Sequence, residues 1–335
     1  MTAVKTSIKI LGTGHYLPER VVTNDDFTAF VDTSDEWIST RTGMQKRHIA
    51  VEDPAWHMGA VAAQRALAAA GLSARDIDMI VVSTCTPDYF CPSAAGLIQR
   101  QLGIKEAMAF DVNAACNGFT VILDMARRYL ATGDVQRVLL VGTEALSQYV
   151  DYTDRASCIL FGDGAGACVV EKAEGLYGAF QANDTEETHI VYGKRRRRTT
   201  PFGEAVQESR FDLFPAQVLD SIVMNGRELY KLVVSKAMPE AVAKACARAG
   251  VAISDLAMIF PHQANLRILQ AAAKNMKISM DKIYENIGEY ANTSSATVPI
   301  GLDEGIRAGK IRRGDTICLV GFGAGINYGA VALTY

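Results

Sequence analysis

The sequence carries two copies of one pattern, and this internal repeat constrains the fold more than any other feature. The copies occupy residues 71–80 and 250–259, an offset of 179 residues, with Gly, Asp and Met-Ile at matching places. Each copy follows an alanine-rich stretch with helical spacing and leads into an apolar strand. The repeat therefore predicts two related α/β units in one chain.

A second pair of matches supports the repeat. A Gly-Asp pair at residues 133–134 precedes one apolar strand, and an identical pair at 314–315 precedes another, at nearly the same offset. We place the N-terminal half, with the nucleophile described below, at residues 1–175 and the C-terminal half at 176–335. A chain of this length is expected to bury a large core.

Composition narrows the function classes. A hydrophobic content of 49% and a formal net charge of −3 give no reason to expect a nucleic-acid or membrane partner. No apolar run approaches the ~20 residues of a membrane-spanning helix, and the N-terminus resembles a strand rather than a signal peptide. Seven cysteines without framework spacing indicate reduced thiols in a cytoplasmic protein, and no metal site is expected.

Cys116 stands where a short apolar strand gives way to a helix. The strand covers residues 107–112, and after Gly118 apolar residues recur at three- and four-residue steps until Thr132-Gly133. The helix dipole and unpaired N–H groups beside a helix N-terminus favour thiolate, the reactive form of cysteine. The segment alone is equally compatible with a small buried core cysteine.

Two polar residues of the C-terminal half, His262 and Asn292, lie next to the ends of predicted strands and helices, where side chains can face a binding or catalytic site. Residues 259–267 read as a strand running into a helix, with His262 at the strand end, where a side chain in an α/β sheet can face a crevice. Residues 290–299 form a small polar turn before a helix and suit Asn292 as a placed hydrogen-bond donor. Each residue alone is also compatible with a structural role.

Two glycine-rich segments, 161–167 and 321–325, have the rhythm of a dinucleotide-binding loop. Each runs into a predicted strand, whereas a dinucleotide fingerprint must open a helix. We therefore expect tight turns between strands or a close approach of backbone to a ligand.

A basic run at residues 194–198 lies close to an acidic stretch at 184–187. A solvated surface loop is the simpler interpretation of this run. A docking surface for an acidic partner is the alternative.

Together, these segments resemble one enzyme family, beta-ketoacyl-acyl carrier protein synthase III. The resemblance covers nearly the whole chain, and the segments that carry it, in family order and spacing, are residues 32–38, 41–43, 111–119, 161–167, 261–267 and 292–299. It implies the five-layered αβαβα thiolase-like fold with two duplicated halves, and a homodimer. It also implies an acyltransferase that begins fatty acid biosynthesis and uses no cofactor.

The resemblance implies that Cys116, His262 and Asn292 form a catalytic triad. Cys116 would hold the acyl group of an acyl-CoA as a thioester, and malonyl on acyl carrier protein would lose CO2 to give the attacking carbanion. His262 Nε2, in the donor tautomer, and the Asn292 amide would stabilise the enolate. The backbone N–H groups of Cys116 and Ala324 are the expected oxyanion hole for the tetrahedral intermediate.

The resemblance also implies substrate contacts. Trp37 and Arg155 are expected to bracket the adenine of coenzyme A, because an indole face and a guanidinium plane suit a base. The other contacts form three groups: the coenzyme A and pantetheine channel, Arg41, Thr42, Gly226 and Asn265; the acyl pocket, Phe90, Cys91, Leu146 and Phe161; and the basic surface for the acidic carrier protein, Lys231, Arg267 and Lys274.

Some positions depart from the family pattern. Cys91 stands where phenylalanine is common, in a loop that the family contributes to the acyl pocket across the dimer, and a smaller gate would admit a longer or branched acyl group. The sequence therefore leaves open a secondary-metabolic acyltransferase or condensing enzyme. A cysteine hydrolase of thioesters and a non-catalytic dimeric scaffold are alternatives from other classes.

Overall fold

The structure is a computed structural model that describes residues 6–196, 198–199, 201, 203, 207, 212–214 and 219–335. Its larger sheet has the strand order β1-β7-β6-β4-β5 and consists of β1 (Thr6–Tyr16), β4 (Met79–Ser83), β5 (Met108–Val112), β6 (Arg137–Ala145) and β7 (Asp163–Glu174). β4 runs parallel to β5 and β6, whereas β7 runs antiparallel to β1 and β6.

The second large sheet has the order β11-β12-β13-β8. Its strands are β8 (Tyr177–Asn183), β11 (Met258–Pro261), β12 (Thr316–Gly323) and β13 (Asn327–Thr334). Two short ladders pair β2 (Arg20–Thr23) with β3 (Lys46–Ile49), and β9 (Val191–Gly193) with β10 (Ile222–Met224). Both glycine-rich segments of the sequence enter strands, β7 and β13, as predicted.

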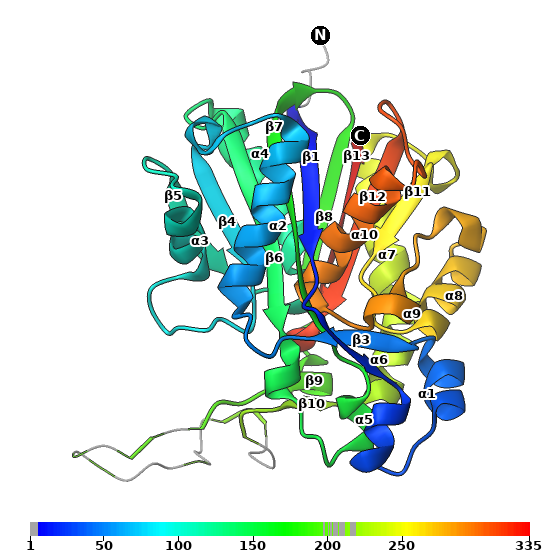
Figure 1. Cartoon of the computed structure of the whole chain (residues 1–335). Helices are drawn as coiled ribbons and strands as arrows, with labels where there is room; N and C mark the ends of the chain where they lie inside the picture. The colour runs from blue at the N-terminus through cyan, green and yellow to red at the C-terminus, as the bar shows by residue number, and fades with distance from the viewer. Residues whose placement is uncertain are drawn as a thin grey trace.

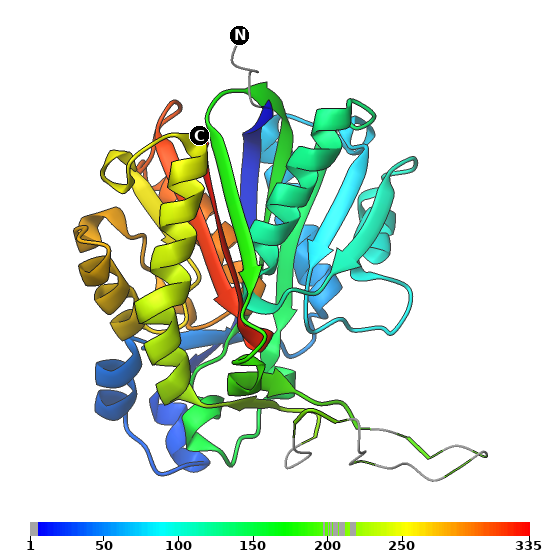
Figure 2. The ribbon, with the colours of Figure 1, turned by 180° about the vertical axis from the view of Figure 1, so that it is seen from behind.

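Helices form three layers around the two sheets, as Figures 1 and 2 show. The outer face of the first sheet is covered by α2 (Ala55–Ala70) and α3 (Ala94–Leu102). Between the sheets lie α4 (Gly118–Thr132) and α10 (Thr297–Arg307), and the second sheet is covered by α7 (Met238–Ala249) and α8 (Leu266–Asn275). Three buried apolar clusters fill these interfaces, so the predicted αβαβα layering is present.

The repeat predicted from the sequence is also present. α2 and α7 each end at a glycine with positive φ, Gly71 at 67° and Gly250 at 82°, followed by a 3-10 turn and then by β4 or β11. Gly133 and Gly314, with φ of 89° and 97°, precede β6 and β12 in the same way. The boundary placed at 175/176 lies between β7 and β8, and the division into halves at that point stays a prediction.

The remaining helices lie near one end of the molecule. α1 (Asp35–Thr42), α5 (Arg155–Cys158), α6 (Gly226–Leu232) and both short ladders gather at the lower end in Figure 1, and α9 (Ile287–Tyr290) packs beside β3. In the described part of the chain, no helix is both long and apolar enough to cross a membrane.

Candidate active site

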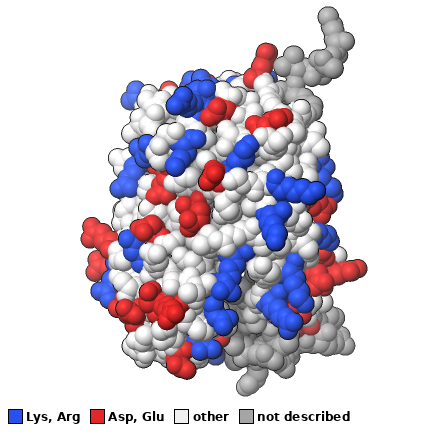
Figure 3. Space-filling model, turned by 90° about the vertical axis from the view of Figure 1, so that its right-hand side faces the viewer, with Lys and Arg blue, Asp and Glu red and all other residues white. Residues whose placement is uncertain are grey.

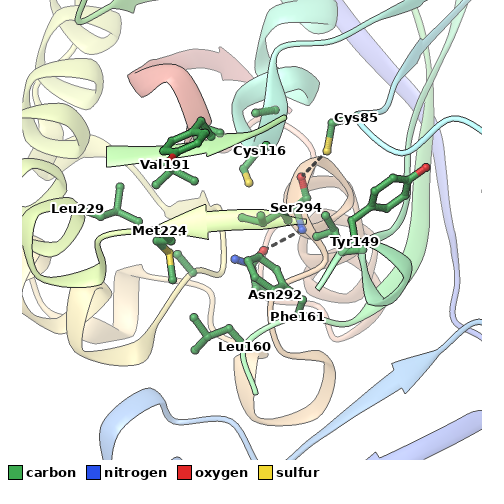
Figure 4. A pocket seen from close by; sticks show the side chains of 18 of the residues that line it. Cys85, Cys116, Tyr149, Leu160, Phe161, Val191, Met224, Leu229, Asn292 and Ser294 are labelled. Atoms are coloured by element: carbon green, nitrogen blue, oxygen red, sulfur yellow. Dashed lines mark hydrogen bonds between the residues drawn. The ribbon is translucent and has the colours of Figure 1, made fainter. Parts of the chain in front are cut away.

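A cavity of about 800 Å³ is lined by residues from both halves of the chain. Most of the predicted site residues meet in its wall: Trp37, Arg41, Thr42, Cys116, Leu146, Phe161, Gly226, His262, Asn265, Asn292 and Ala324. Six predicted residues lie outside this wall: Phe90, Cys91, Arg155, Lys231, Arg267 and Lys274. Figure 4 shows Cys116 and Asn292 facing the same space.

Cys116 lies in a 3-10 turn, Ala115–Asn117, between β5 and α4, as the sequence predicts. The chain bends sharply before the thiol, with Ala115 at a φ of 46°. Gly323 packs so closely against this turn that a Cβ at that position would lie 2.6 Å from Cys116 N. The missing side chain at Gly323 therefore lets the segment of Ala324 approach Cys116, as the proposed oxyanion hole requires.

The predicted thiolate at Cys116 is wrong for the resting protein. Loss of solvation raises the pKa of the Cys116 thiol to about 12, although a hydrogen bond with Ser294 opposes the shift. The nearby Glu144 raises this pKa further. The loss of solvation therefore outweighs the helix N-terminus, although Cys116 is only half-buried and lines the cavity. The nucleophile is therefore stored as a neutral thiol.

This raised pKa predicts a distinctive reactivity. Only thiolate alkylates, so iodoacetamide should modify Cys116 roughly tenfold faster for each pH unit between 7 and 10, without a plateau. Peptide mass spectrometry after timed alkylation measures this rate. The exposed Cys91, quantified in the same digest, is the internal control for the activity of the iodoacetamide. A plateau at Cys116 below pH 8 would show that the helix dipole prevails after all.

His262 follows β11 and is 2% exposed. Its Nδ1 lies 2.8 Å from Thr297 Oγ1, and the Thr297 hydroxyl donates to the Ser294 carbonyl oxygen at 2.8 Å. Because that hydroxyl has only one proton, Nδ1 is the donor, and Nε2 is an acceptor in the neutral ring. Burial lowers the pKa of His262 to about 3, so the ring is neutral at pH 7. The predicted Nε2 donor tautomer is therefore not the resting one.

Asn292 follows α9 and is 7% exposed. Its backbone donates to the Leu160 carbonyl and accepts from Gly162 N–H, each at 3.0 Å, which ties it to the start of β7. Its side-chain Oδ1 accepts a hydrogen bond from Ser294 N–H at 2.9 Å, the dashed line in Figure 4. Because the oxygen is occupied, the NH2 group remains available as a hydrogen-bond donor.

Family models and curated relatives similar to this chain point to one family. Family models described as 3-oxoacyl-[acyl-carrier-protein (ACP)] synthase III and its C terminal part match residues 110–184 and 246–335. A beta-ketoacyl-[acyl-carrier-protein] synthase III from Clostridium acetobutylicum is 40% identical over 331 residues, which are 98% of this chain and 99% of that protein. The chain belongs to the beta-ketoacyl-[acyl-carrier-protein] synthase III family.

Solved structures agree with this assignment. The 3-oxoacyl-[acyl-carrier-protein] synthase III of Aquifex aeolicus VF5 has a TM-score of 0.87 and 40% identity, covering 98% of this chain and 100% of that one. The priming beta-ketosynthase of the R1128 polyketide pathway has a TM-score of 0.87 and 33% identity, with coverages of 98% and 96%. The thiolase-like fold is thus confirmed, and the synthase is a condensing acyltransferase that initiates fatty acid synthesis.

The predicted adenine sandwich is closed in this structure. The Arg155 guanidinium carbon lies 4.6 Å from the Trp37 ring centroid, and that of Arg41 lies 4.9 Å from it. A base between two planes needs roughly 7 Å, two van der Waals gaps. Arg155, which also donates to the Asp32 carbonyl at 2.8 Å, would therefore have to move for a base to enter beside Trp37.

The predicted gate and carrier surface lie outside the cavity. Phe90 is 97% exposed and Cys91 is also exposed, so neither contributes to the acyl pocket of its own chain. Lys231, Arg267 and Lys274 are exposed on α6 and α8. Figure 3 shows lysine and arginine side chains spread over the face that carries α8, with acidic side chains among them and at both edges.

The basic run differs partly from the prediction of a solvated loop. Lys194 and Arg195 line the cavity, and Lys194 pairs with Asp212 at 2.7 Å. Arg196 pairs with Asp220 at 3.4 Å, and Arg197 lies outside the described residues. The first residues after β9, Lys194 and Arg195, therefore form part of the rim of the site.

Four residues of the site were not assigned a role from the sequence: Cys85, Glu144, Ser294 and Thr297. Cys85 and Ser294 line the cavity, whereas Glu144 and Thr297 lie behind it. A lone acidic residue at the end of the apolar run 138–145 is the signal that marks Glu144. The described residues contain no group of three or more His, Cys, Asp or Glu side chains placed to hold a metal ion.

Proposed function

We propose that Cys116 accepts the acyl group of an acyl-CoA primer, and that the acyl-enzyme then condenses with malonyl on acyl carrier protein to give a 3-oxoacyl-acyl carrier protein. The observation that carries this proposal is the meeting of Cys116, His262 and Asn292, from three distant segments, in the wall of one cavity. A thiol, a neutral imidazole and an available amide donor are the groups that two successive thioester reactions need.

In the loading step, His262 Nε2 accepts the thiol proton as Cys116 Sγ attacks the thioester carbon. The bond from that carbon to the coenzyme A sulfur breaks, and the departing thiolate takes a proton from solvent. Backbone N–H groups of Cys116 and Ala324 stabilise the oxyanion between these events. His262 retains its proton, and the malonyl carboxylate that enters next stabilises the imidazolium.

In the condensing step, the malonyl C–C bond breaks and CO2 leaves with its electron pair remaining on the α-carbon. The resulting enolate oxygen accepts hydrogen bonds from Asn292 Nδ2 and from the protonated His262 Nε2. The α-carbon then attacks the acyl carbon, and Cys116 Sγ leaves as thiolate. That thiolate takes the His262 proton, which restores the neutral pair.

Substrate contacts follow from the same residues. We propose that Trp37, Arg41, Thr42, Arg155, Gly226 and Asn265 bind coenzyme A or the pantetheine arm, and that Leu146 and Phe161 face the acyl chain. Asn265 supports this because it caps α8 and also donates to the Arg41 carbonyl at 3.2 Å, joining two walls of the cavity. We also propose that Lys231, Arg267 and Lys274 dock the acidic carrier protein.

We further propose a homodimer joined at β5. β5 is an edge strand of its sheet, and its first residue, Met108, is 46% exposed. An exposed edge with apolar residues is suited to pairing with a second copy. The exposed loop of Phe90 and Cys91 would then reach the partner's acyl pocket. Sedimentation equilibrium tests this, and a monomer at micromolar concentration would contradict it.

We propose that the synthase works in the cytoplasm without a resident cofactor. All seven cysteines are free thiols, which suits a reducing compartment. The steps above need only the side chains and backbone groups of this chain together with its two thioester substrates.

A second candidate is a condensing enzyme of secondary metabolism with a longer or branched acyl donor. The small Cys91 at the proposed gate favours it. The R1128 priming beta-ketosynthase, at 33% identity over 98% of the chain, is less similar than the Aquifex aeolicus synthase at 40%.

Intact-protein mass spectrometry with acyl-CoAs from acetyl to dodecanoyl tests both candidates. An adduct on Cys116 from acetyl-CoA, chased by malonyl-acyl carrier protein to a 3-oxoacyl product, supports the fatty acid initiator. An adduct from longer or branched donors alone supports the second candidate. Free acid released from acyl-CoA would indicate a thioester hydrolase, and no adduct from any donor would contradict acyl transfer.

A further inference from the structure

Glu144 is a buried acidic residue close to the nucleophile. It stands near the end of β6 with no exposed surface. Among the described residues it has no lysine, arginine or histidine partner. Its oxygens instead accept from backbone and hydroxyl or thiol groups, chiefly Cys85 N–H at 3.0 Å, Thr86 Oγ1 at 2.8 Å, Ser294 Oγ at 3.2 Å and Ser295 Oγ at 2.7 Å. A buried acid is costly to keep unless such hydrogen bonds satisfy it.

Ser294 connects this acid to the site. Its backbone N–H donates to Asn292 Oδ1, and its carbonyl accepts from Thr297, whose hydroxyl oxygen meets His262 Nδ1. One residue therefore orients both the amide and the imidazole. Its φ is 51°, in the left-handed region that a non-glycine residue adopts only when its surroundings hold it there.

The side chain of Ser294 holds that conformation through Glu144. Its Oγ hydrogen-bonds Glu144 Oε1, while Cys85 Sγ is farther away at 3.9 Å. Glu144 in turn is held by Cys85 N–H and Thr86 Oγ1, at the end of β4. The acid thus joins two parallel strands of the first sheet to the turn that follows Asn292.

We propose that Glu144 is a positioning residue of the synthase, which acts through Ser294 to fix the Asn292 amide and the His262 imidazole for condensation. The inference rests on the roles proposed above for those two residues. Displacing a reacting group by about 1 Å costs on the order of a hundredfold in rate. A turn that Glu144 holds in place through Ser294 can therefore affect the rate of condensation strongly.

Glu144 is the acceptor in these contacts. The Ser295 hydroxyl donates to Glu144 Oε1 at 2.7 Å and also lies 3.1 Å from the Ser83 carbonyl oxygen. Burial raises the pKa of Glu144, and the hydrogen bonds from Ser295, Thr86 and Cys85 oppose this rise.

The test compares Ser294→Ala with a matched control, Ser295→Ala. Both variants remove one serine hydroxyl from the same acid, but only Ser294 is bonded to Asn292 and Thr297, and only its hydroxyl meets the Cys116 thiol. Starting from enzyme already acylated at Cys116 keeps the free thiol out of the comparison. Condensation is measured as CO2 release from malonyl-acyl carrier protein by enzyme already loaded at Cys116. We expect a loss of about tenfold or more for Ser294→Ala and less than twofold for Ser295→Ala, with similar melting temperatures.

A second comparison identifies the route of the effect. If Ser294 acts through its partners, Ser294→Ala should cost less than threefold when Asn292 is already alanine. Glu144→Gln, which keeps the size of the side chain and an oxygen that can accept from Ser294, should remain within threefold of the wild type.

Three results would overturn the inference: equal losses in both serine variants, a full tenfold loss in the Asn292→Ala background, or a loss in Glu144→Gln as large as in Ser294→Ala. The proposed function is judged separately, because it fails only if wild-type enzyme neither loads Cys116 nor releases CO2.

Discussion

Replacing Cys116 with alanine should abolish acyl loading, by at least about a thousandfold, and leave the fold intact. The reason is that the covalent intermediate has no other place to form. Cys85 is the second thiol of the cavity, but burial and then Glu144 raise its pKa well above the usual range. Intact-protein mass spectrometry after incubation with radiolabelled or unlabelled acyl-CoA measures the adduct.

Two controls accompany this experiment, one for the fold of the variant and one for the position of any acyl group. Circular dichroism and thermal melting of Cys116→Ala check the fold, since removing one sulfur atom from a cavity wall disturbs little packing. Peptide mapping reports where any residual adduct lies. An acyl group on Cys85, or loading at the wild-type rate, would mean that Cys116 is not the nucleophile.

The repeat predicted two related α/β halves from local sequence signals, and the family resemblance predicted their five-layered arrangement. The glycines that end α2 and α7 adopt positive φ, and the strands after them lie exactly one offset apart, at Met79 and Met258. These glycines mark the ends of helices in the sequence itself, so they can be recognised without knowledge of the tertiary structure. The catalytic triad was predicted from the family resemblance, since each of its residues alone was compatible with a structural role, and all three residues lie in the wall of one cavity.

Solvation was the property that the sequence could not predict. The position of Cys116 beside α4 suggested a thiolate, whereas loss of solvation in the folded protein raises the pKa of the thiol. The tautomer of His262 depends on Thr297, which lies 35 residues away in sequence. The pKa of Cys116 and the tautomer of His262 both depend on atoms that folding brings together, so the residues adjacent in sequence do not predict them.

The low pKa of His262 and the high pKa of Cys116 together describe a resting site without charge. A neutral thiol and a neutral imidazole are compatible with an apolar acyl chain in the same cavity. Charge then develops only when the thioester is attacked, at a point where backbone N–H groups and the incoming carboxylate can stabilise it.

Changing Asn292 to aspartate should separate the two half-reactions. An aspartate keeps the acceptor that Ser294 N–H occupies at 2.9 Å, so the turn and its backbone should be preserved. The aspartate replaces the amide NH2 donor by a carboxylate oxygen, whose negative charge repels the enolate. We therefore expect loading of Cys116 within about threefold of the wild type, and condensation lower by on the order of 10²–10³, the usual effect of losing one oxyanion donor.

Single-turnover kinetics from preloaded acyl-enzyme measures condensation, and adduct formation from acyl-CoA measures loading. Asn292→Ala is the matched comparison, because it removes both the donor and the acceptor and so adds the loss of the Ser294 contact. A normal condensation rate in Asn292→Asp would remove Asn292 from the enolate site. Equal losses in loading and condensation would instead mean that the residue supports the structure of the cavity, since only a donor aimed at the enolate affects one step and spares the other.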